Sequence, residues 1–240
     1  MKDQKTIGFI GAGNMAQAII KGMIGSAGYD PQKIMIYDID RLKCRQIART
    51  QGVGVAQDSC EVVLQSDIIF LAVKPQNYEE VLSVLSAAVT QDKVFVSIAA
   101  GISTAYIMEK LGVPCPVIRV MPNTPLLLGQ GATALCRAEH VTDEAFALVC
   151  DIFAASGEIA VLKEDKMNAV IAVNGSSPAY VYLFAKALLD YADSVGIPKE
   201  AALKLVCKTL EGSAAMLRSS GNSADDLIKM VSSPGGTTLK

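Results

Sequence analysis

Short runs of consecutive apolar residues, separated by segments of helical periodicity, constrain the fold of this chain more than any other feature. The helical segments include residues 16–25, 42–51 and 78–89. The apolar runs lie at residues 6–10, 33–37, 67–73, 94–98 and 116–121. Strands that are apolar on both sides need cover on both faces, and their alternation with helices is typical of a parallel sheet. We therefore predict an α/β fold with a doubly wound, mostly parallel sheet.

The pattern changes after residue 162. A weaker strand–helix–strand pattern at 132–136, 142–156 and 159–162 is followed by helical patterns alone. The later helical patterns lie at 165–173, between Ser177 and Gly196, at 199–218 and at 224–231. Ser177 with Pro178 is a typical helix start, Gly196 a typical stop, and Ser223 with Asp226 resembles a capping box. We predict an α/β domain at residues 1–162 and an all-α domain at 163–240.

The glycine-containing turn after the first predicted strand suggests a nucleotide site. Gly11, Gly13 and Ala16 follow the spacing G-x-G-x-x-A, directly after a strand and at the start of a helix. Gly11 permits a tight turn, Gly13 permits close approach of a pyrophosphate, and Ala16 allows close packing of the helix on its strand. In a repeated strand–helix pattern this motif predicts a Rossmann-type dinucleotide-binding domain.

Two residues near the end of the second predicted strand bear on the cofactor. Asp38 lies 25 residues after Gly13, where an acidic side chain can bind the adenosine ribose of NAD(H). Arg41 could instead reach the 2′-phosphate of NADP(H). The residues leave the choice between NADPH and NADH open.

Two later strand ends are predicted to line the same site. Residues 72–76 and 97–101 follow strands at the carboxyl edge of the sheet, where such folds bind ligands, and they are mostly small. Lys74 is the charged residue of this pair of segments. A catalytic base and a surface lysine are both compatible with its position.

Composition excludes several classes of protein. The net charge of −2 and a pI near 5.5 give no basic surface for nucleic acid. Of the most apolar stretches, residues 67–73 are too short to cross a membrane and residues 169–187 are interrupted by polar residues, glycine and proline, and no leader pattern opens the chain. The six cysteines form no CxxC pair and one histidine accompanies them, so we expect small core residues, neither a metal site nor disulfides, and a cytoplasmic location.

The expected reaction class follows from the scarcity of acidic proton donors among the candidate residues. Hydride transfer to a carbonyl needs a proton donor, and His140 falls on a polar connection. A protonated imine needs none, because hydride addition yields a neutral amine. The terminal stretch "SSPGGTT" combines glycines, hydroxyls and backbone amides that could hold a carboxylate. We favour that interpretation over an ordinary helix-ending turn.

These motifs together resemble the pyrroline-5-carboxylate reductase family, which reduces a cyclic imino acid to proline. The resemblance covers nearly the whole chain. The stretches that carry it are "GFIGAGNMAQAII", "FLAVKPQ", "SIAAG", "VIRVMPNTP", "NGSSPAY" and, most specifically, "VSSPGGTT".

The resemblance implies roles for individual residues. Thr238 is implied as the hydrogen-bond partner of the ring nitrogen and a possible proton donor. Substrate binding is implied for Glu164, Ser233, Gly236, Thr237 and Thr238. With Asp38, the implied cofactor-binding residues are Ile10, Gly11, Ala12, Gly13, Asn14, Met15, Ala72, Val73, Lys74, Pro75, Ile98, Ala99 and Ala100.

The family resemblance also implies assembly. The helical domain is rich in Ala, Gly and Ser, as in "EGSAAML", and from the residues alone its apolar face could serve dimerisation or packing on the first domain. The family implies a homodimer, often further assembled into rings of dimers. Family chains usually carry a further helix after "GGTT", so we expect this sequence, which ends at Lys240, to be shortened.

The sequence departs from the family pattern at several positions. Ser59 and Met230 stand where relatives often have Asn, and "NGSSPAY" replaces the more usual "SGSGPAY". Two other functions remain compatible with the residues. One is a dehydrogenase for a small hydroxy acid, with Lys74 or Lys166 as base, and the other is a non-catalytic regulator that keeps nucleotide binding.

Overall fold

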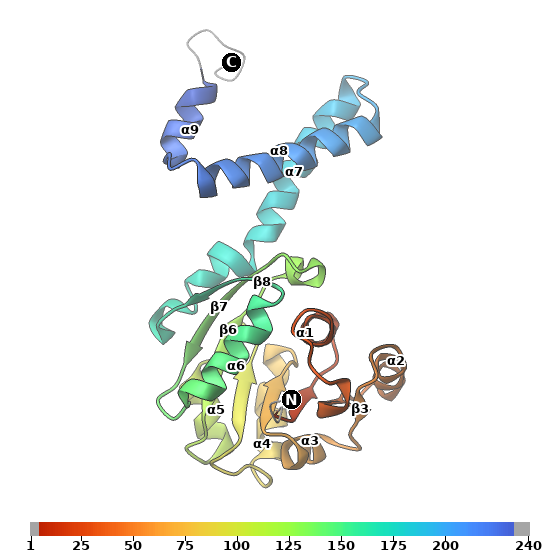
Figure 1. The fold of residues 1–240 in the computed structure, drawn as a ribbon, viewed down its shortest axis with the longest axis vertical. Helices are drawn as coiled ribbons and strands as arrows, with labels where there is room; N and C mark the ends of the chain where they lie inside the picture. Colours follow the sequence, from red (N-terminus) through yellow and green to blue (C-terminus); the bar gives the residue numbers. More distant parts are fainter. Residues whose placement is uncertain (1–4, 233–240) are drawn as a thin grey trace. The chain divides into compact units, whose positions relative to one another are not determined.

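The computed structural model describes residues 5–232 of the chain (Figure 1). It divides into two compact units, one ending at Pro178 and one beginning at Ala179. The first unit is built on one eight-stranded sheet with the order β3-β2-β1-β4-β5-β6-β7-β8. Its strands are β1 (Ile7–Ile10), β2 (Ile34–Tyr37), β3 (Gly54–Val55), β4 (Ile68–Leu71), β5 (Val94–Ser97), β6 (Val117–Met121), β7 (Gly131–Arg137) and β8 (Gly157–Val161).

The sheet confirms the predicted fold class. All neighbouring strands are parallel except β6 and β7, which are antiparallel. The strand order reverses its direction of growth between β1 and β4, and a crevice at the carboxyl ends of the strands is expected at such a switch point.

Helices cover both faces of the sheet, as continuous apolar strands require. They are α1 (Asn14–Gly25), α2 (Arg41–Gln51), α3 (Ser59–Gln65), α4 (Tyr78–Leu85), α5 (Thr104–Leu111) and α6 (Asp143–Ala154). Buried side chains of α1, α2 and α6 form one apolar layer with one side of the strands, and those of α3, α4 and α5 form the other. In the first layer Phe9 and Phe70 stack with ring centroids 4.5 Å apart, and Phe153 of α6 packs against Phe70.

Three elements of this unit were not predicted from the sequence. Strand β3 has two residues, and helices α3 and α5 have seven and eight. Two residues are too few to show the alternation of a strand, and seven or eight residues give only about two turns of helical periodicity. The pattern of these segments therefore does not stand out from the flanking loops. In the described part of this unit, four short 3₁₀ helices complete the connections: η1 (Pro31–Lys33), η2 (Pro75–Asn77), η3 (Thr124–Leu128) and η4 (Glu164–Lys166).

The segment after β8 differs from the helix predicted at residues 165–173. It consists of η4, a turn, and the π-helical η5 (Ile171–Gly175), which leads into α7 (Ser177–Ser194). The Asn174 side chain donates to the backbone oxygens of Met121, at 2.7 Å, and Ala132, at 2.9 Å. Those bonds tie η5 to β6 and β7. Because α7 follows directly, Ser177 is not an N-cap; its hydroxyl donates to the Asn174 carbonyl.

The division into units lies later than the predicted boundary after residue 162. Met167, which follows η4, is fully buried with Ala134 and Cys136 of β7. The residues between β8 and the start of α7 therefore pack on the sheet of the first unit.

The second unit is helical, as predicted. Its elements are the main part of α7, α8 (Lys199–Ser219) and α9 (Ala224–Val231). Helix α7 ends in a Schellman motif at Gly196, whose φ is +79°, with Ile197 N–H donating to the Ala192 carbonyl. The predicted cap of α9 is confirmed, because Ser223 Oγ accepts from the backbone N–H of Asp226. Within residues 5–232, no helix combines the length and apolar character needed to cross a membrane.

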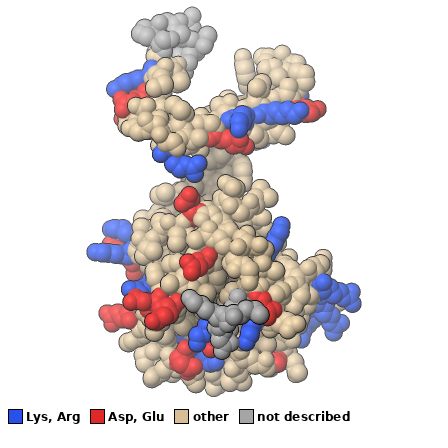
Figure 2. Space-filling view, viewed as in Figure 1, with Lys and Arg blue, Asp and Glu red and all other residues tan. Residues whose placement is uncertain are grey.

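The cysteines are less uniformly buried than predicted. Cys44, Cys115 and Cys136 are core residues, Cys60 and Cys150 are half-buried, and Cys207 of α8 is exposed. Acidic and basic side chains both occur on each unit in the face drawn in Figure 2. That mixture agrees with the small net charge of the sequence.

Candidate active site

The turn between β1 and α1 has the geometry that its glycines predict. Gly11 has φ +101°, and its N–H donates to the Tyr37 carbonyl of β2 at 2.7 Å. A Cβ on Gly11 would lie 2.5 Å from the backbone oxygen of Ala72. A side chain is therefore excluded at Gly11 by both backbone conformation and space.

Gly13 differs from Gly11 in both backbone conformation and surroundings. It is the N-cap of α1 in an extended conformation, and a Cβ there would meet no protein atom within 4 Å. No side chain caps this helix and no acidic residue occupies its first turn. Free N–H groups at a helix start, beside open space, fit a pyrophosphate.

Asp38 follows β2 and holds the glycine turn. Its Oδ2 accepts from the backbone N–H of Ala12 at 2.7 Å, and its Oδ1 accepts from that of Asp40 at 2.9 Å. The Lys43 ammonium lies 3.9 Å from Oδ1. The carboxylate thus binds the protein itself, with one further acceptor position on each oxygen.

A cavity of about 730 Å³ opens beside this turn, within the first unit. Seven of the predicted cofactor residues line it: Ile10, Gly11, Gly13, Asp38, Ala72, Val73 and Lys74. Its other lining residues are Tyr37, Ile39, Lys43, Ser59, Gln76, Asn77, Glu80, Val81 and Val84. A volume of this size suits a small-molecule or cofactor site.

The remaining predicted cofactor residues lie around the cavity without lining it. Ala12 is buried beneath the turn, and Asn14 and Met15 begin α1. Pro75 opens η2, while residues 98–100 follow β5. Since Leu71 of β4 pairs with Ser97 of β5, the segments after these two strands share one edge of the sheet.

Most of the lining residues missed by the sequence analysis come from α4 and the turn before it. Asn77 lies just before α4, and Glu80 and Val81 follow it by three and four residues. Val84 follows those two by four and three residues, so all four side chains lie on one side of the helix. That spacing was a usable signal, but it also fits a helix packed on a sheet.

The two basic side chains after β2 have different positions. Arg41 donates to the carbonyls of Ala56 and Gln57, at 2.8 and 3.2 Å, and packs over the Tyr37 ring. Lys43, two residues later, lines the cavity.

Glu164 belongs to a separate polar cluster. Its Oε1 accepts from the guanidinium of Arg119, at 2.9 Å, and from the Thr104 N–H, while its Oε2 accepts from the Cys136 thiol at 2.8 Å. Arg119 is 3% exposed and also donates to Asn168. Burial, and then the hydrogen bond to Glu164 and its charge, raise the pKa of Cys136 to about 12, so this thiol is a proton donor.

The three residues considered for other chemistry, His140, Lys166 and Lys74, have different surroundings. His140 is exposed in the connection between β7 and α6, as predicted. Lys166 forms an ion pair with its neighbour Asp165 at 2.9 Å, and Lys74 is exposed at the rim of the cavity. The predicted carboxylate turn, with Ser233, Gly236, Thr237 and Thr238, lies outside the described residues.

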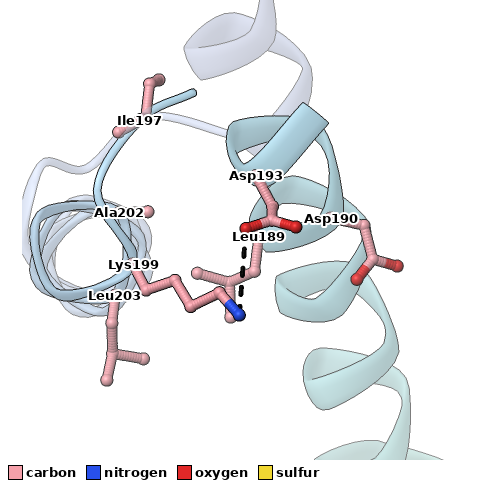
Figure 3. Close-up of a pocket in the computed structure, with 7 residues that line it drawn as sticks. All are labelled: Leu189, Asp190, Asp193, Ile197, Lys199, Ala202 and Leu203. Carbon is pink, nitrogen blue, oxygen red and sulfur yellow. Dashed lines mark ion pairs between the residues drawn. The ribbon is translucent and has the colours of Figure 1, made fainter. Parts of the chain in front are cut away.

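A smaller cavity of about 300 Å³ lies in the second unit, between α7 and α8 (Figure 3). Lys199 of α8 extends toward Asp193 of α7, with 3.9 Å between the charged atoms, and the apolar walls include Leu189 and Leu203. Its polar lining residues are Lys199, Asp190 and Asp193. Among residues 5–232, no group of His, Cys, Asp and Glu is arranged to hold a metal ion.

Two protein-family models match the chain. Residues 6–101 match the model for NADP oxidoreductases that are coenzyme F420-dependent. Residues 164–240 match the model for pyrroline-5-carboxylate reductase dimerisation.

Similar proteins carry one name across distant organisms. The chain is 40% identical to pyrroline-5-carboxylate reductase of Escherichia coli over 237 residues, which are 99% of this chain and 88% of the relative. It is 37% identical to the Arabidopsis thaliana enzyme of the same name over 233 residues, 97% of this chain and 84% of the relative.

Solved structures of the same family have the same fold. A pyrroline-5-carboxylate reductase from Coxiella burnetii matches with a TM-score of 0.87 and 35% identity, covering 99% of this chain and 88% of that one. The Plasmodium falciparum pyrroline carboxylate reductase, crystallised with NADP bound, matches with a TM-score of 0.90 and 30% identity, covering 99% and 87%. With identities of this size along nearly its whole length, the chain belongs to the pyrroline-5-carboxylate reductase family.

Proposed function

We propose that this chain is an NAD(P)H-dependent reductase that converts 1-pyrroline-5-carboxylate to L-proline, the final step of proline biosynthesis. The observation that carries the proposal is the cavity at the switch point of the sheet, with its glycine turn, in a chain 35–40% identical to reductases of this name. The cofactor is NADPH or NADH.

The residues around the cavity fit such a cofactor. Gly13 leaves space and free backbone N–H groups for the pyrophosphate, and Ala72 and Val73 give a flat, small-residue wall at the sheet edge. Bound NAD(P)H supplies a hydride. The protein orients the imino acid so that this hydride meets the carbon of the C=N bond.

Reduction of a protonated imine requires no acidic side chain as a proton donor. Reduction adds a hydride to the imine carbon, and the electron pair of the C=N π bond passes to nitrogen. A substrate already protonated on nitrogen thereby becomes a secondary amine without further proton transfer. With an unprotonated imine, a hydroxyl beside nitrogen would donate the proton.

The family resemblance supports the rest of the site. We propose that Ser233, Gly236, Thr237 and Thr238 hold the substrate carboxylate and that Thr238 contacts the ring nitrogen. Glu164 is proposed to act near the substrate as well. Three of its acceptor positions are used by Arg119, Thr104 and Cys136, and its side chain is 38% exposed, which leaves an edge free.

Assembly is part of the same proposal. We propose a homodimer formed through the helical domain at 163–240, and beyond it rings of dimers and a cytoplasmic location. A dimerisation model matches residues 164–240, and many large apolar side chains of α7, α8 and α9 are exposed in the single chain. Ala192 and Ala202 are the buried residues of these three helices.

Oxidation of NADPH or NADH on addition of 1-pyrroline-5-carboxylate to the purified full-length protein tests the function. We expect stoichiometric formation of proline. A chain that binds the cofactor but never oxidises it would support the regulatory alternative. Reduction of NAD(P)⁺ by small hydroxy acids, with no activity on the imino acid, would support the dehydrogenase alternative.

Thr238→Ala tests the proposed terminal site. The variant should turn over the imino acid more slowly than the parent, because it lacks the hydroxyl beside nitrogen, while cofactor binding and thermal stability stay unchanged. Turnover at the parent rate would remove Thr238 from the mechanism.

A further inference from the structure

The buried hydroxyl of Tyr78 is unexplained by packing alone. Tyr78 opens α4 and is 1% exposed, with its ring in the apolar layer formed by α3, α4 and α5. Its hydroxyl reaches the carboxyl edge of the sheet, 2.8 Å from the Leu71 carbonyl and 2.9 Å from the Ser97 hydroxyl. Leu71 ends β4 and Ser97 ends β5.

The direction of each hydrogen bond follows from the donors present. A carbonyl can only accept, so the single phenolic proton of Tyr78 is donated to Leu71 O. Ser97 then donates its own proton to the Tyr78 oxygen. The Ser97 oxygen in turn accepts from the backbone N–H of Ala99, at 3.5 Å. The result is one directed chain of bonds from Ala99 through Ser97 and Tyr78 to Leu71, in which each bond polarises the next.

This series of hydrogen bonds joins the segments that form the proposed cofactor site. Leu71 leads into residues 72–75, Ser97 leads into residues 98–100, and Tyr78 begins the helix whose Glu80, Val81 and Val84 line the cavity. The Leu71 carbonyl also accepts from the N–H of Ile98 at 3.4 Å. The Ala72 carbonyl oxygen lies 2.5 Å from the position that a Cβ on Gly11 would take, so the end of β4 also limits the space for the glycine turn.

Burial keeps the Tyr78 phenol protonated, as the hydrogen bond to the Leu71 carbonyl requires. Burial raises the pKa of Tyr78, and the hydrogen bond with Ser97, which lowers it, offsets only part of that rise. The hydroxyl is therefore protonated and available as a donor throughout the neutral range.

We propose that Tyr78 is a positioning residue for the cofactor: its hydroxyl fixes the ends of β4 and β5 and the start of α4 relative to one another at the edge where the nicotinamide cofactor binds. The inference rests on the proposed function, because it assumes that NAD(P)H occupies this edge. Tyr78 itself touches no substrate. The expected consequence of losing its hydroxyl is weaker cofactor binding with little change in the fold.

Tyr78→Phe in the full-length protein tests this. We expect the Kd for NADPH or NADH, measured by calorimetry, and the KM for the same cofactor to rise about threefold to tenfold, as the loss of one or two buried hydrogen bonds implies. The KM for the imino acid should stay within about twofold of the parent. Ser97→Ala should weaken cofactor binding in the same direction, and adding it to Tyr78→Phe should have little further effect, because the chain is already broken.

Tyr29→Phe is the matched control. Tyr29 is 5% exposed, and its hydroxyl donates to the Lys5 carbonyl just before β1, at the opposite edge of the sheet. This variant should lose stability comparable to Tyr78→Phe while it keeps the parent Kd for the cofactor.

The outcomes separate this inference from the proposed function. Failure of the parent protein to bind either cofactor would overturn both. A parent that binds and reduces normally, with Tyr78→Phe at the parent Kd, would overturn the inference alone. Equal weakening by Tyr29→Phe would also overturn it, because it would indicate a general loss of rigidity. If Tyr78→Phe does not fold, Ser97→Ala decides, since it leaves the Tyr78 ring in place.

Discussion

The carboxylate of Asp38 lies between the glycine turn and the start of α2. It accepts hydrogen bonds from the backbone N–H of Ala12, in the glycine turn, and from that of Asp40, the N-cap of α2. The sequence predicted this residue as a ligand for the adenosine ribose. In the structure it also supports the turn that would hold the pyrophosphate, and both roles use the same two oxygens.

Asp38→Ala should therefore weaken NADPH and NADH binding alike. Loss of the bond to Ala12 leaves a buried N–H unpaired and loosens the turn, so we expect the KM for both cofactors to rise about threefold to tenfold. Steady-state kinetics with each cofactor measure this. Asp58→Ala, which removes the N-cap of α3 but no bond to the turn, is the control. A loss confined to NADH would show that contact with the ribose is the dominant role.

At the scale of elements, the two glycines of the loop between β1 and α1 are required for different reasons. Gly11 is required by the protein, because a Cβ would collide with the Ala72 backbone and its φ is positive. Gly13 is required by neither conformation nor packing, since its φ is −69° and an added Cβ meets no protein atom.

Gly11→Ala and Gly13→Ala should therefore have separable effects. Gly13→Ala should keep the parent melting temperature and lose cofactor affinity by about tenfold or more, because the added methyl group occupies space meant for the pyrophosphate. Gly11→Ala should lose both, since a strained residue costs about 1–3 kcal/mol of stability. Calorimetric melting and cofactor titration of both variants measure these effects. Parent-like cofactor binding by Gly13→Ala would place the pyrophosphate elsewhere.

The segment before α7 differs from its prediction because of tertiary contacts. The sequence predicted an α-helix at 165–173 and a capped start at Ser177, but the chain forms η4 and η5 and continues into α7. Asn174, which stands where the family pattern has Ser, bonds to two backbone carbonyls of β6 and the start of β7. Those tertiary bonds favour the wider π-helical turn over a local cap.

At the scale of the whole molecule, the exposed apolar side chains of the second unit predict its state of assembly. Leu183 is 68% exposed and Phe184 57%, although both are large and apolar. Replacing both with Ser should convert the proposed dimer to monomer in sedimentation experiments at micromolar concentration, because it removes apolar area from the contact. Leu64→Ser, at a 65% exposed leucine of α3, should leave the assembly unchanged. A dimer that survives the double substitution would place the contact elsewhere.

Stability at alkaline pH is a second property of the whole molecule. Burial, and to a lesser extent the charge of Asp67, raises the pKa of Tyr29 to about 12. An unfolded tyrosine has a pKa near 10. Between these values the unfolded chain releases a proton that the folded chain keeps, so the free energy of unfolding falls as pH rises from about 10 to 12. Denaturant titrations across this range should show a shallower decline for Tyr29→Phe. An identical decline would show that Tyr29 does not contribute.

The sequence by itself determined the features that depend on neighbouring residues. Apolar runs and helical periods specified the strands, the sheet type and the helical second half, and the glycine spacing specified the turn at Gly11, because backbone conformation and side-chain direction repeat over a few residues. Cofactor-lining residues at the ends of β1 and β4 followed from that topology, since parallel strands end at one edge.

Only the tertiary structure decided which polar groups meet. Asp38 bonds to Ala12 across 26 positions, Glu164 pairs with Arg119 across 45, and the Tyr78 hydroxyl joins two strand ends. None of these contacts leaves a periodic trace in the sequence. A buried donor or acceptor takes whichever partner the packed chain brings within about 3 Å, and that choice depends on the arrangement of whole elements.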